Sequence, residues 1–392
     1  MIYFLSFSVV VIVSALVMDA IPQFNIWQSR IKIGRFPNQH IWNEKVFQTA
    51  KKWLHNTPVI PLTDHKRLII IDKWQGNYDR PAIQVWQESS LVLGLTAYAQ
   101  KTAAQKTEKE IADFFISKTT AQGGWKIKPT DSDHAILGYA LLNADFIDAG
   151  KYKAALDETY QMILSLKGED GTIAYKNHVR QFRFVDTIGF ICPFLVKYGV
   201  KFNKPEAIQL ALHQVFEFVK YGLMPQEKIP CHTYHLHTKI PTGLFGWGRG
   251  LGWFLIGLAD TYRALPVLHP QKATLKHLII EVAHSVLKFQ LLDGSYTWLI
   301  FDEKSRKDSS TVATVAYFLT VAAEIPELKI ESNEAKEKCL NYLQKVTRRT
   351  GAIDFSQGDT KGIGIYSQNF DILPFTQGFV LRTLNFRPQP QP

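Results

Sequence analysis

Hydrophobic and polar positions change in character from one helical segment to the next along residues 41–386. Six segments carry a polar stripe beside their apolar positions, which is typical of helices that face water on one side. These striped segments are 41–54, 104–118, 151–166, 204–220, 271–289 and 333–348. Six others, each following a striped one, are apolar almost all round, which indicates helices buried on every side. These buried segments are 84–99, 132–146, 186–198, 248–265, 309–323 and 373–384.

Strict alternation of striped and buried helices predicts an all-α protein with an (α/α)6 barrel fold. Six hairpins close into a ring when each places its apolar helix inside and its striped helix outside. Strands do not alternate with helices, which excludes an α/β fold with a parallel sheet. We expect one catalytic domain over residues 41–386, a lead-in at 19–40 and a disordered Pro/Gln tail at 387–392.

The connections into the buried helices repeat one pattern. A turn signal such as Gly123-Gly124 precedes a short apolar stretch, and an acidic residue follows near the start of the next buried helix. Such self-similarity is typical of repeat architectures. All buried helices then begin at one end of the barrel, where the longer loops should surround the pocket. The acidic residues in this pattern are Asp133, Asp186, Asp308 and Asp371.

Residues 1–18 form an apolar N-terminal segment, because the run 2–17 is almost wholly hydrophobic and Asp19 ends it. The run is short for a membrane-spanning helix, which needs about 20 residues. It is also unusual as a secretory signal, since no Lys or Arg precedes it and residues 18–20 make a poor cleavage site. We expect it to associate the chain with the cell envelope, as a membrane anchor or an export signal, with its topology open. A helix packed on the domain itself is the alternative.

Composition narrows the range of partners. The chain has 392 residues, 46% hydrophobic and 20% charged, which suits a globular protein with a large core. Its net charge of +10 is spread over the striped helices and favours acidic partners such as an anionic polysaccharide. No basic stripe or known motif indicates nucleic acid binding. The three cysteines imply no disulfide framework.

Asp133 and Asp186 each start a buried helix, so both should face the same mouth of the barrel. Two carboxylates that converge on one cavity are the minimum set for acid and base catalysis at a glycosidic bond. The alternative is helix capping, because Asp is a preferred N-cap residue. A helix N-terminus favours the ionised carboxylate, so a catalytic acid there needs burial or a neighbouring carboxylate to keep its proton. Asp308, followed by two serines, is read as a cap.

The stretch Gly246–Trp253 alternates glycine with two indoles, an arginine and a leucine. Glycines let a backbone and a ligand approach closely, and Trp247 and Trp253 offer flat faces to a sugar ring. The planar fork of Arg249 suits a carboxylate, from either the protein or a substrate. Trp125 lies on a comparable loop and is a further candidate for sugar stacking. A tight turn with both indoles in the core is the alternative.

Histidines add polar candidates at the same end. The stretch Cys231–His237 lacks the spacing of a standard zinc site, so we predict no metal and prefer one histidine from this loop as a substrate ligand. His134 would face the mouth beside Asp133 or pack as a polar helix residue. No phosphate loop or dinucleotide fingerprint occurs in a convincing context, and no cofactor is predicted.

At these residues the chain resembles the unsaturated glucuronyl and rhamnogalacturonyl hydrolases, glycoside hydrolase families 88 and 105. Residues 247–253 are similar to the family signature Trp-x-Arg-Gly-Asn-Gly-Trp, with Leu251 in the place of its Asn. Residues 184–195 resemble the segment that carries the family's catalytic acid, with Phe184 in the place of a Trp. Asp133-His134 resembles an earlier active-site aspartate. The resemblance spans residues 75–385 and implies the (α/α)6 barrel.

The family chemistry implied is hydration of the C4=C5 double bond of an unsaturated uronyl oligosaccharide. Asp186 would protonate the double bond, and Asp133 would position or deprotonate the water or share a proton with Asp186. Arg249 would bind polar groups of the substrate, together with His232 or, alternatively, His235. Trp247 and Trp253 would shape the sugar pocket. Two other functions stay open: an inverting glycosidase on an acidic polysaccharide, and a non-catalytic envelope protein that binds polysaccharide.

Overall fold

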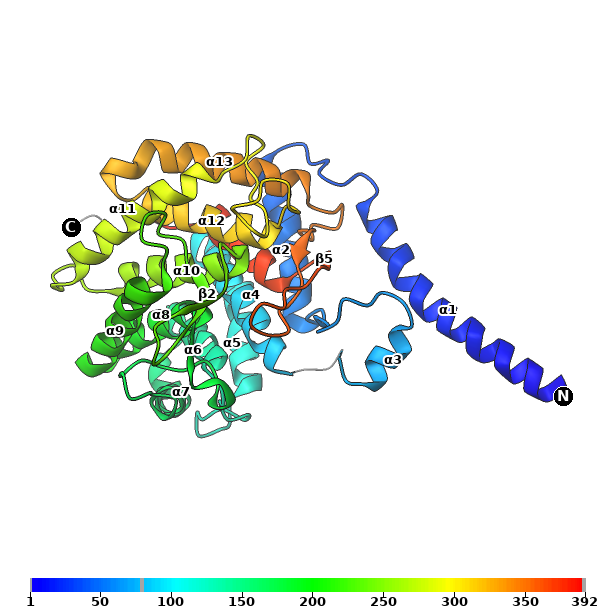
Figure 1. The fold of residues 1–392 in the computed structure, drawn as a ribbon, viewed down its shortest axis with the longest axis horizontal. Helices are drawn as coiled ribbons and strands as arrows, with labels where there is room; N and C mark the ends of the chain where they lie inside the picture. Colours follow the sequence, from blue (N-terminus) through cyan, green and yellow to red (C-terminus); the bar gives the residue numbers. More distant parts are fainter. Residues whose placement is uncertain (1, 78–80, 390–392) are drawn as a thin grey trace.

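A computed structural model describes residues 2–77 and 81–389 and contains the predicted double ring of helices (Figure 1). The inner helices are α4 (Pro81–Thr102), α6 (Ala135–Asn143), α8 (Asp186–Lys201), α10 (Gly248–Ala264), α12 (Ser309–Ala322) and α14 (Pro374–Leu384). The outer helices are α2 (Gln39–His55), α5 (Gln105–Lys118), α7 (Lys153–Ser165), α9 (Pro205–Gly222), α11 (Lys272–Lys288) and α13 (Lys329–Lys345). Every predicted striped segment is an outer helix and every apolar segment an inner one, which confirms the (α/α)6 barrel.

The inner helices pack side by side in chain order, and α14 packs against α4 to close the ring. Glycines permit the closest approaches. A Cβ atom on Gly94 of α4 would lie 2.4 Å from the carbonyl oxygen of Gly378 in α14. A Cβ on Gly189 of α8 would lie 2.7 Å from the carbonyl oxygen of Trp253 in α10. Only a residue without a side chain fits such contacts.

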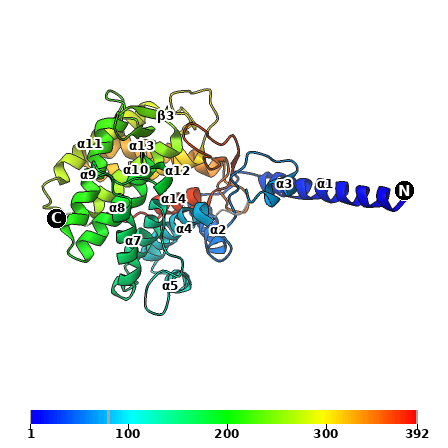
Figure 2. The same cartoon turned by 60° about the horizontal axis from the view of Figure 1, so that its bottom comes forward.

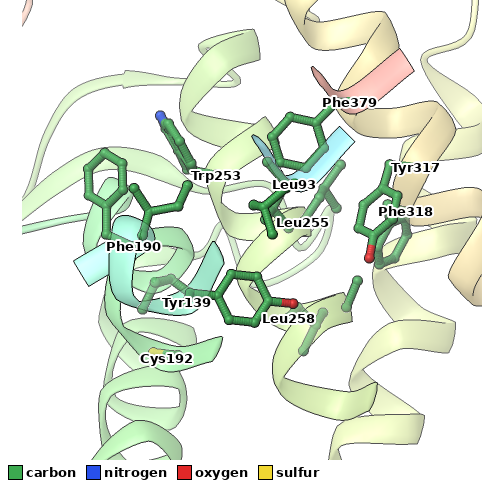
Figure 3. Close-up of a cluster of buried hydrophobic side chains, with 14 of the residues drawn as sticks. Leu93, Tyr139, Phe190, Cys192, Trp253, Leu255, Leu258, Tyr317, Phe318 and Phe379 are labelled. Atoms are coloured by element: carbon green, nitrogen blue, oxygen red, sulfur yellow. The ribbon is translucent and has the colours of Figure 1, made fainter. Parts of the chain in front are cut away.

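Side chains from all six inner helices meet in the centre of the ring. Figure 3 shows part of this cluster, from Leu93 on α4 and Tyr139 on α6 to Phe379 on α14. Tyr139, at 3% exposure, is the least buried of these three side chains. The barrel interior is therefore a packed core, and a site can form only at its ends.

The N-terminal helix α1 (Ile2–Arg30) is longer than the apolar run suggested and projects away from the helical body (Figures 1 and 2). Its 29 residues measure about 43 Å at 1.5 Å per residue, so the helix is long enough to cross a membrane. None of its most apolar window is buried in the protein, which contradicts packing of this segment on the domain. At its C-terminal end Arg30 binds the buried Asp354 with two nitrogens, at 2.6 and 3.0 Å.

The remaining elements are short and lie in the connections between helices. An antiparallel sheet joins β1 (Phe182–Phe184), β2 (Cys231–His235) and β3 (Pro241–Phe245) in that order, and β4 (Ser356–Gln357) pairs with β5 (Phe370–Asp371). Neither sheet, nor the short helix α3 (Ile69–Trp74), is predicted by the pattern of hydrophobic and polar positions. Single 3-10 turns are η1 (Ser132–His134), η2 (Ala149–Tyr152), η3 (Asn177–Val179) and η4 (Pro326–Leu328).

The C-terminal tail is described as far as Gln389. Its side-chain amide donates to the carbonyl oxygen of Arg263 at 2.8 Å, and its backbone N–H donates to Glu324 at the same distance. This part of the predicted disordered segment is therefore held against the barrel. Residues 390–392 of that prediction lie outside the described residues.

Candidate active site

A cavity of about 480 Å³ opens at the end of the barrel where the inner helices begin. Three carboxylates line it: Asp133, Asp186 and Asp359. Its basic residues are Lys176, His178, Arg249 and Lys361, and its aromatic residues are Trp86, Tyr175, Phe184, Phe190 and Trp253. Acidic groups, basic groups and apolar ring faces thus converge in a space large enough for a small sugar.

Asp186 is the first residue of α8, and its side chain is buried but for 13% of its surface. Its Oδ2 has no hydrogen-bond partner among the described residues, and His232 Nε2 lies 3.9 Å from it. Burial raises the pKa of Asp186 to about 7, against the opposing effects of its own backbone N–H and of Arg249, and the charges of Asp359 and Asp133 add to the rise. The carboxyl therefore keeps its proton in a large share of molecules at neutral pH.

Asp308 is the helix cap that its sequence predicted. Its carboxylate accepts the backbone N–H groups of Ser310 and Thr311 at the start of α12, at 2.9 and 3.3 Å. Asp186 makes no comparable bond at the start of α8 among the hydrogen bonds of the described residues. The capping alternative therefore holds for Asp308 and fails for Asp186.

Asp133 lies in η1, immediately before α6, and is fully buried. Its Oδ1 is 3.2 Å from His134 Nδ1, and its Oδ2 is 3.5 Å from the Tyr175 hydroxyl and 3.7 Å from Lys176 Nζ. Burial lowers the pKa of His134, but the hydrogen bond and negative charge of Asp133 outweigh this and leave that pKa raised. Asp133 thus has polar or charged groups within 4 Å of both carboxylate oxygens, although its Oδ1, like Asp186 Oδ2, has no hydrogen-bond partner among the described residues.

Arg249 is buried and bound by the loop between β4 and β5. Its Nη1 and Nη2 donate to the backbone carbonyls of Gln357 and Gly358, and Nη2 lies 3.9 Å from Asp359 Oδ1. The partner that a buried arginine requires is therefore a loop of the protein itself. Burial raises the pKa of Asp359, although Arg249 acts in the opposite direction. Arg249 holds this third carboxylate at the cavity.

His232 comes from β2 and lines the cavity, as does His178 of η3. Its ring lies 4.6 Å from the Trp247 ring, centre to centre, and its Nδ1 lies 3.3 Å from the Tyr366 hydroxyl. Burial, with the nearby charge of Arg249, lowers the pKa of His232 to about 3, so the ring is neutral at physiological pH. His235, the alternative from the sequence, is not among the residues that line the cavity. Its Nδ1 accepts the backbone N–H of Thr238.

The predicted tryptophans have different positions. Trp253 lines the cavity and packs on Phe190, with ring centres 4.3 Å apart. Trp247 lies behind the cavity surface, where its Nε1 donates to the Gln357 side chain at 3.0 Å. Trp125 lies outside the cavity lining and its Nε1 donates to Thr159 on α7 at 2.9 Å, which corrects the expectation that it faces the mouth.

His134 is not among the residues that line the cavity. Its ring contacts Asp133, which does line it. Four further residues line the cavity that no motif in the sequence singled out: Asp359, Trp86, Tyr175 and Lys176. The helix-start pattern pointed instead to Asp371, which pairs with Arg348 away from the cavity. The available signal was the polar, glycine-containing stretch 356–364, which is long for a connection between helices.

Comparison with known proteins identifies the family and supports the fold. The family model described as Glycosyl Hydrolase Family 88 matches residues 61–374. A possible member of family GH105 from Salmonella enterica superposes with a TM-score of 0.75 at 17% identity, covering 90% of this chain and 94% of that one.

Two unsaturated glucuronyl hydrolases are also similar in structure. The enzyme from Bacillus sp. GL1, described as responsible for glycosaminoglycan degradation, has a TM-score of 0.64 at 16% identity and covers 87% of this chain and 94% of its own. An enzyme described as specific for heparin has a TM-score of 0.65 at 17% identity, with 88% and 96% covered. These likenesses establish the barrel fold, and the family match covers most of the sequence. The resemblance noticed in the sequence is confirmed: this chain belongs to glycosyl hydrolase family 88 and is a glycoside hydrolase.

Proposed function

We propose that this glycoside hydrolase acts on oligosaccharides that end in an unsaturated uronyl residue, by hydrating the C4=C5 double bond. The observation that carries the proposal is Asp186, a buried carboxyl with one unpartnered oxygen and a pKa of about 7, in a cavity that also holds basic side chains. Support also comes from similar proteins that are described as unsaturated glucuronyl hydrolases.

In the proposed reaction Asp186 donates its proton to C4, and the π electrons of the double bond form the new C–H bond. The cation at C5 is stabilised by the ring oxygen, and a water oxygen adds there. The proton lost by the water returns to the carboxylates, so that Asp186 regains its proton. The C5 hemiketal opens by breaking its bond to the ring oxygen, and the hemiacetal left at C1 then releases the neighbouring sugar. One water molecule is consumed.

Each other residue has a role that follows from its contacts. Asp133, held by Tyr175 and Lys176, orients or deprotonates the water. His232 is neutral and offers its Nε2, on the Asp186 side, to substrate hydroxyl groups. Arg249 positions the loop that carries Asp359. Trp253 supplies an apolar wall for the sugar.

The test uses the ultraviolet absorbance of the unsaturated uronide, which disappears when the double bond is hydrated. We expect the protein to remove this absorbance and Asp186→Asn to abolish the loss. Asp113→Asn, on the outer helix α5, is the matched control and should leave the rate unchanged. If the wild-type protein leaves every unsaturated uronide intact but frees reducing ends from saturated acidic polymers, the inverting glycosidase is the correct function and hydration is wrong.

We also propose that α1 anchors the enzyme in the cell envelope. The helix segment Tyr3–Arg30 has a mean hydropathy of 2.4 in its most apolar window, and the protein itself buries none of that window. Fractionation of cells that express the full chain tests this. The protein should remain in the membrane fraction after a carbonate wash, and its recovery in the soluble fraction would contradict the anchor.

A further inference from the structure

The short helix α3 and the residues before it present an unusual surface. Leu68, Ile70, Ile71 and Trp74 are all exposed, and Trp74 is 88% exposed. The neighbouring Lys66 and Arg67 are exposed as well. We call these six residues the α3 surface. Exposed aliphatic residues and a tryptophan beside basic side chains are the composition of a segment that lies in a membrane interface.

The position of α3 relative to α1 supports this interpretation. Asp19 is the first charged residue after the apolar run of α1. Its carboxylate accepts the backbone N–H groups of Leu68 at 2.7 Å and Ile69 at 3.0 Å. The α3 surface therefore begins at the level where α1 stops being apolar. In Figures 1 and 2, α3 stands on the side of the helical body from which α1 projects.

We propose that the α3 surface lies on the bilayer that α1 enters, with its apolar side chains among the lipid headgroups and upper acyl chains. Trp74 occupies the depth that tryptophan prefers at a membrane interface. Lys66 and Arg67 meet anionic headgroups, which attract basic residues near the surface. This inference rests on the proposed anchoring by α1, and it adds a second, independent contact that fixes the orientation of the enzyme.

The orientation matters because the α3 surface connects to the rim of the cavity. Leu62, a few residues before α3, lines the cavity. Asp64 forms an ion pair with Lys361 at 2.9 Å and accepts the hydroxyl of Ser367 at 2.6 Å, and both belong to the loop between β4 and β5. One short segment thus joins the membrane contact to the loop that carries Asp359. The proposal places the mouth of the active site beside the membrane surface.

The experiment uses the full chain in phosphatidylcholine vesicles, with or without phosphatidylglycerol. Single cysteines carry an environment-sensitive fluorophore at Ile71→Cys on α3, at Val11→Cys on α1 and at Ile330→Cys on α13. Ile330 is the control, because it is exposed and lies on an outer helix. The three natural cysteines are buried, so they compete little for the label.

We expect the Ile71 label to be quenched by a lipid with a nitroxide near its headgroup and protected severalfold from iodide, relative to the Ile330 label. Reversing the charges, as in Lys66→Glu with Arg67→Glu, should reduce this protection in phosphatidylglycerol vesicles and leave the Val11 label unchanged. The Val11 label reports the anchor separately, through quenching by deep nitroxide lipids.

Two results would overturn the proposal. In the first, iodide reaches the Ile71 label as freely as the Ile330 label while the Val11 label is in lipid. In the second, the Ile71 label is already protected in detergent and shows energy transfer between copies, which would make the α3 surface a protein–protein contact. Lipid contact at Ile71 without lipid contact at Val11 would support the α3 surface and refute the anchor.

Discussion

The acid that we assign to catalysis should also destabilise the folded protein, and Asp186→Asn tests this. The pKa of Asp186 rises from its ordinary value of 3.8 to about 7 on folding. Each pKa unit corresponds to about 1.4 kcal/mol. Ionised Asp186 therefore lowers the free energy of unfolding by about 4 kcal/mol, and asparagine removes this penalty because it cannot ionise.

The sign of the effect sets its pH window. Below pH 3.8 the carboxyl is protonated in both folded and unfolded chains, so the penalty is absent. Between 3.8 and about 7 the folded chain binds a proton that the unfolded chain has lost, so stability falls as pH rises. Above about 7 the full penalty applies. Asp186→Asn should therefore stabilise the protein most at pH 8 and change its stability little near pH 4.

The assay is urea unfolding of the detergent-solubilised chain, followed by near-ultraviolet circular dichroism at pH 4.5, 6 and 8. Asp113→Asn provides the control, because its carboxylate is 55% exposed on an outer helix and pairs with Lys109 one turn earlier. We expect the difference in free energy of unfolding between Asp186→Asn and Asp113→Asn to grow as the pH rises. A gain for Asp186→Asn that is the same at all three values would refute the reasoning, because it would not come from ionisation.

Three further substitutions test the fold and the site. Arg382→Met leaves the buried Asp260 without its bidentate partner, at 2.9 and 3.0 Å, and should lower the urea midpoint by the equivalent of about 3–5 kcal/mol. Gly94→Ala forces a Cβ against the backbone of Gly378 and should cost about 1–3 kcal/mol, measured in the same way. Trp125→Phe should leave kcat and KM for the uronide unchanged, because this indole lies outside the cavity. A raised KM would indicate that Trp125 contacts the sugar after all.

The helical ring could be predicted from the sequence because it is encoded locally. A helix such as α12, buried along its whole length, has no polar stripe, whereas α5 carries charges on one face. Helix α3 escaped prediction because it has only six residues and is held by Asp19, some 50 positions earlier in the chain. No local pattern records a contact of that kind.

The candidate site was predictable only in part. Asp133 and Asp186 were found because both precede buried helices, but their sequence positions could not separate a catalytic carboxyl from a cap. That distinction depends on burial and missing donors, which only the folded chain displays. Asp359 was missed because Arg249, about 110 residues earlier, places its loop at the cavity.

The closed ring also has a consequence for protein synthesis. The backbone N–H of Phe375, on the last inner helix, donates to the side chain of Gln87 on the first, across 288 residues of chain. Chains fold as they emerge from the ribosome, N-terminal parts first. One side of the first inner helix, α4, therefore lacks its packing partner α14 until nearly the whole chain has been translated. Phe375 also packs on Trp86 and Trp253, which line the cavity, so a chain truncated before α14 should be an open, inactive arc that chaperones and proteases recognise.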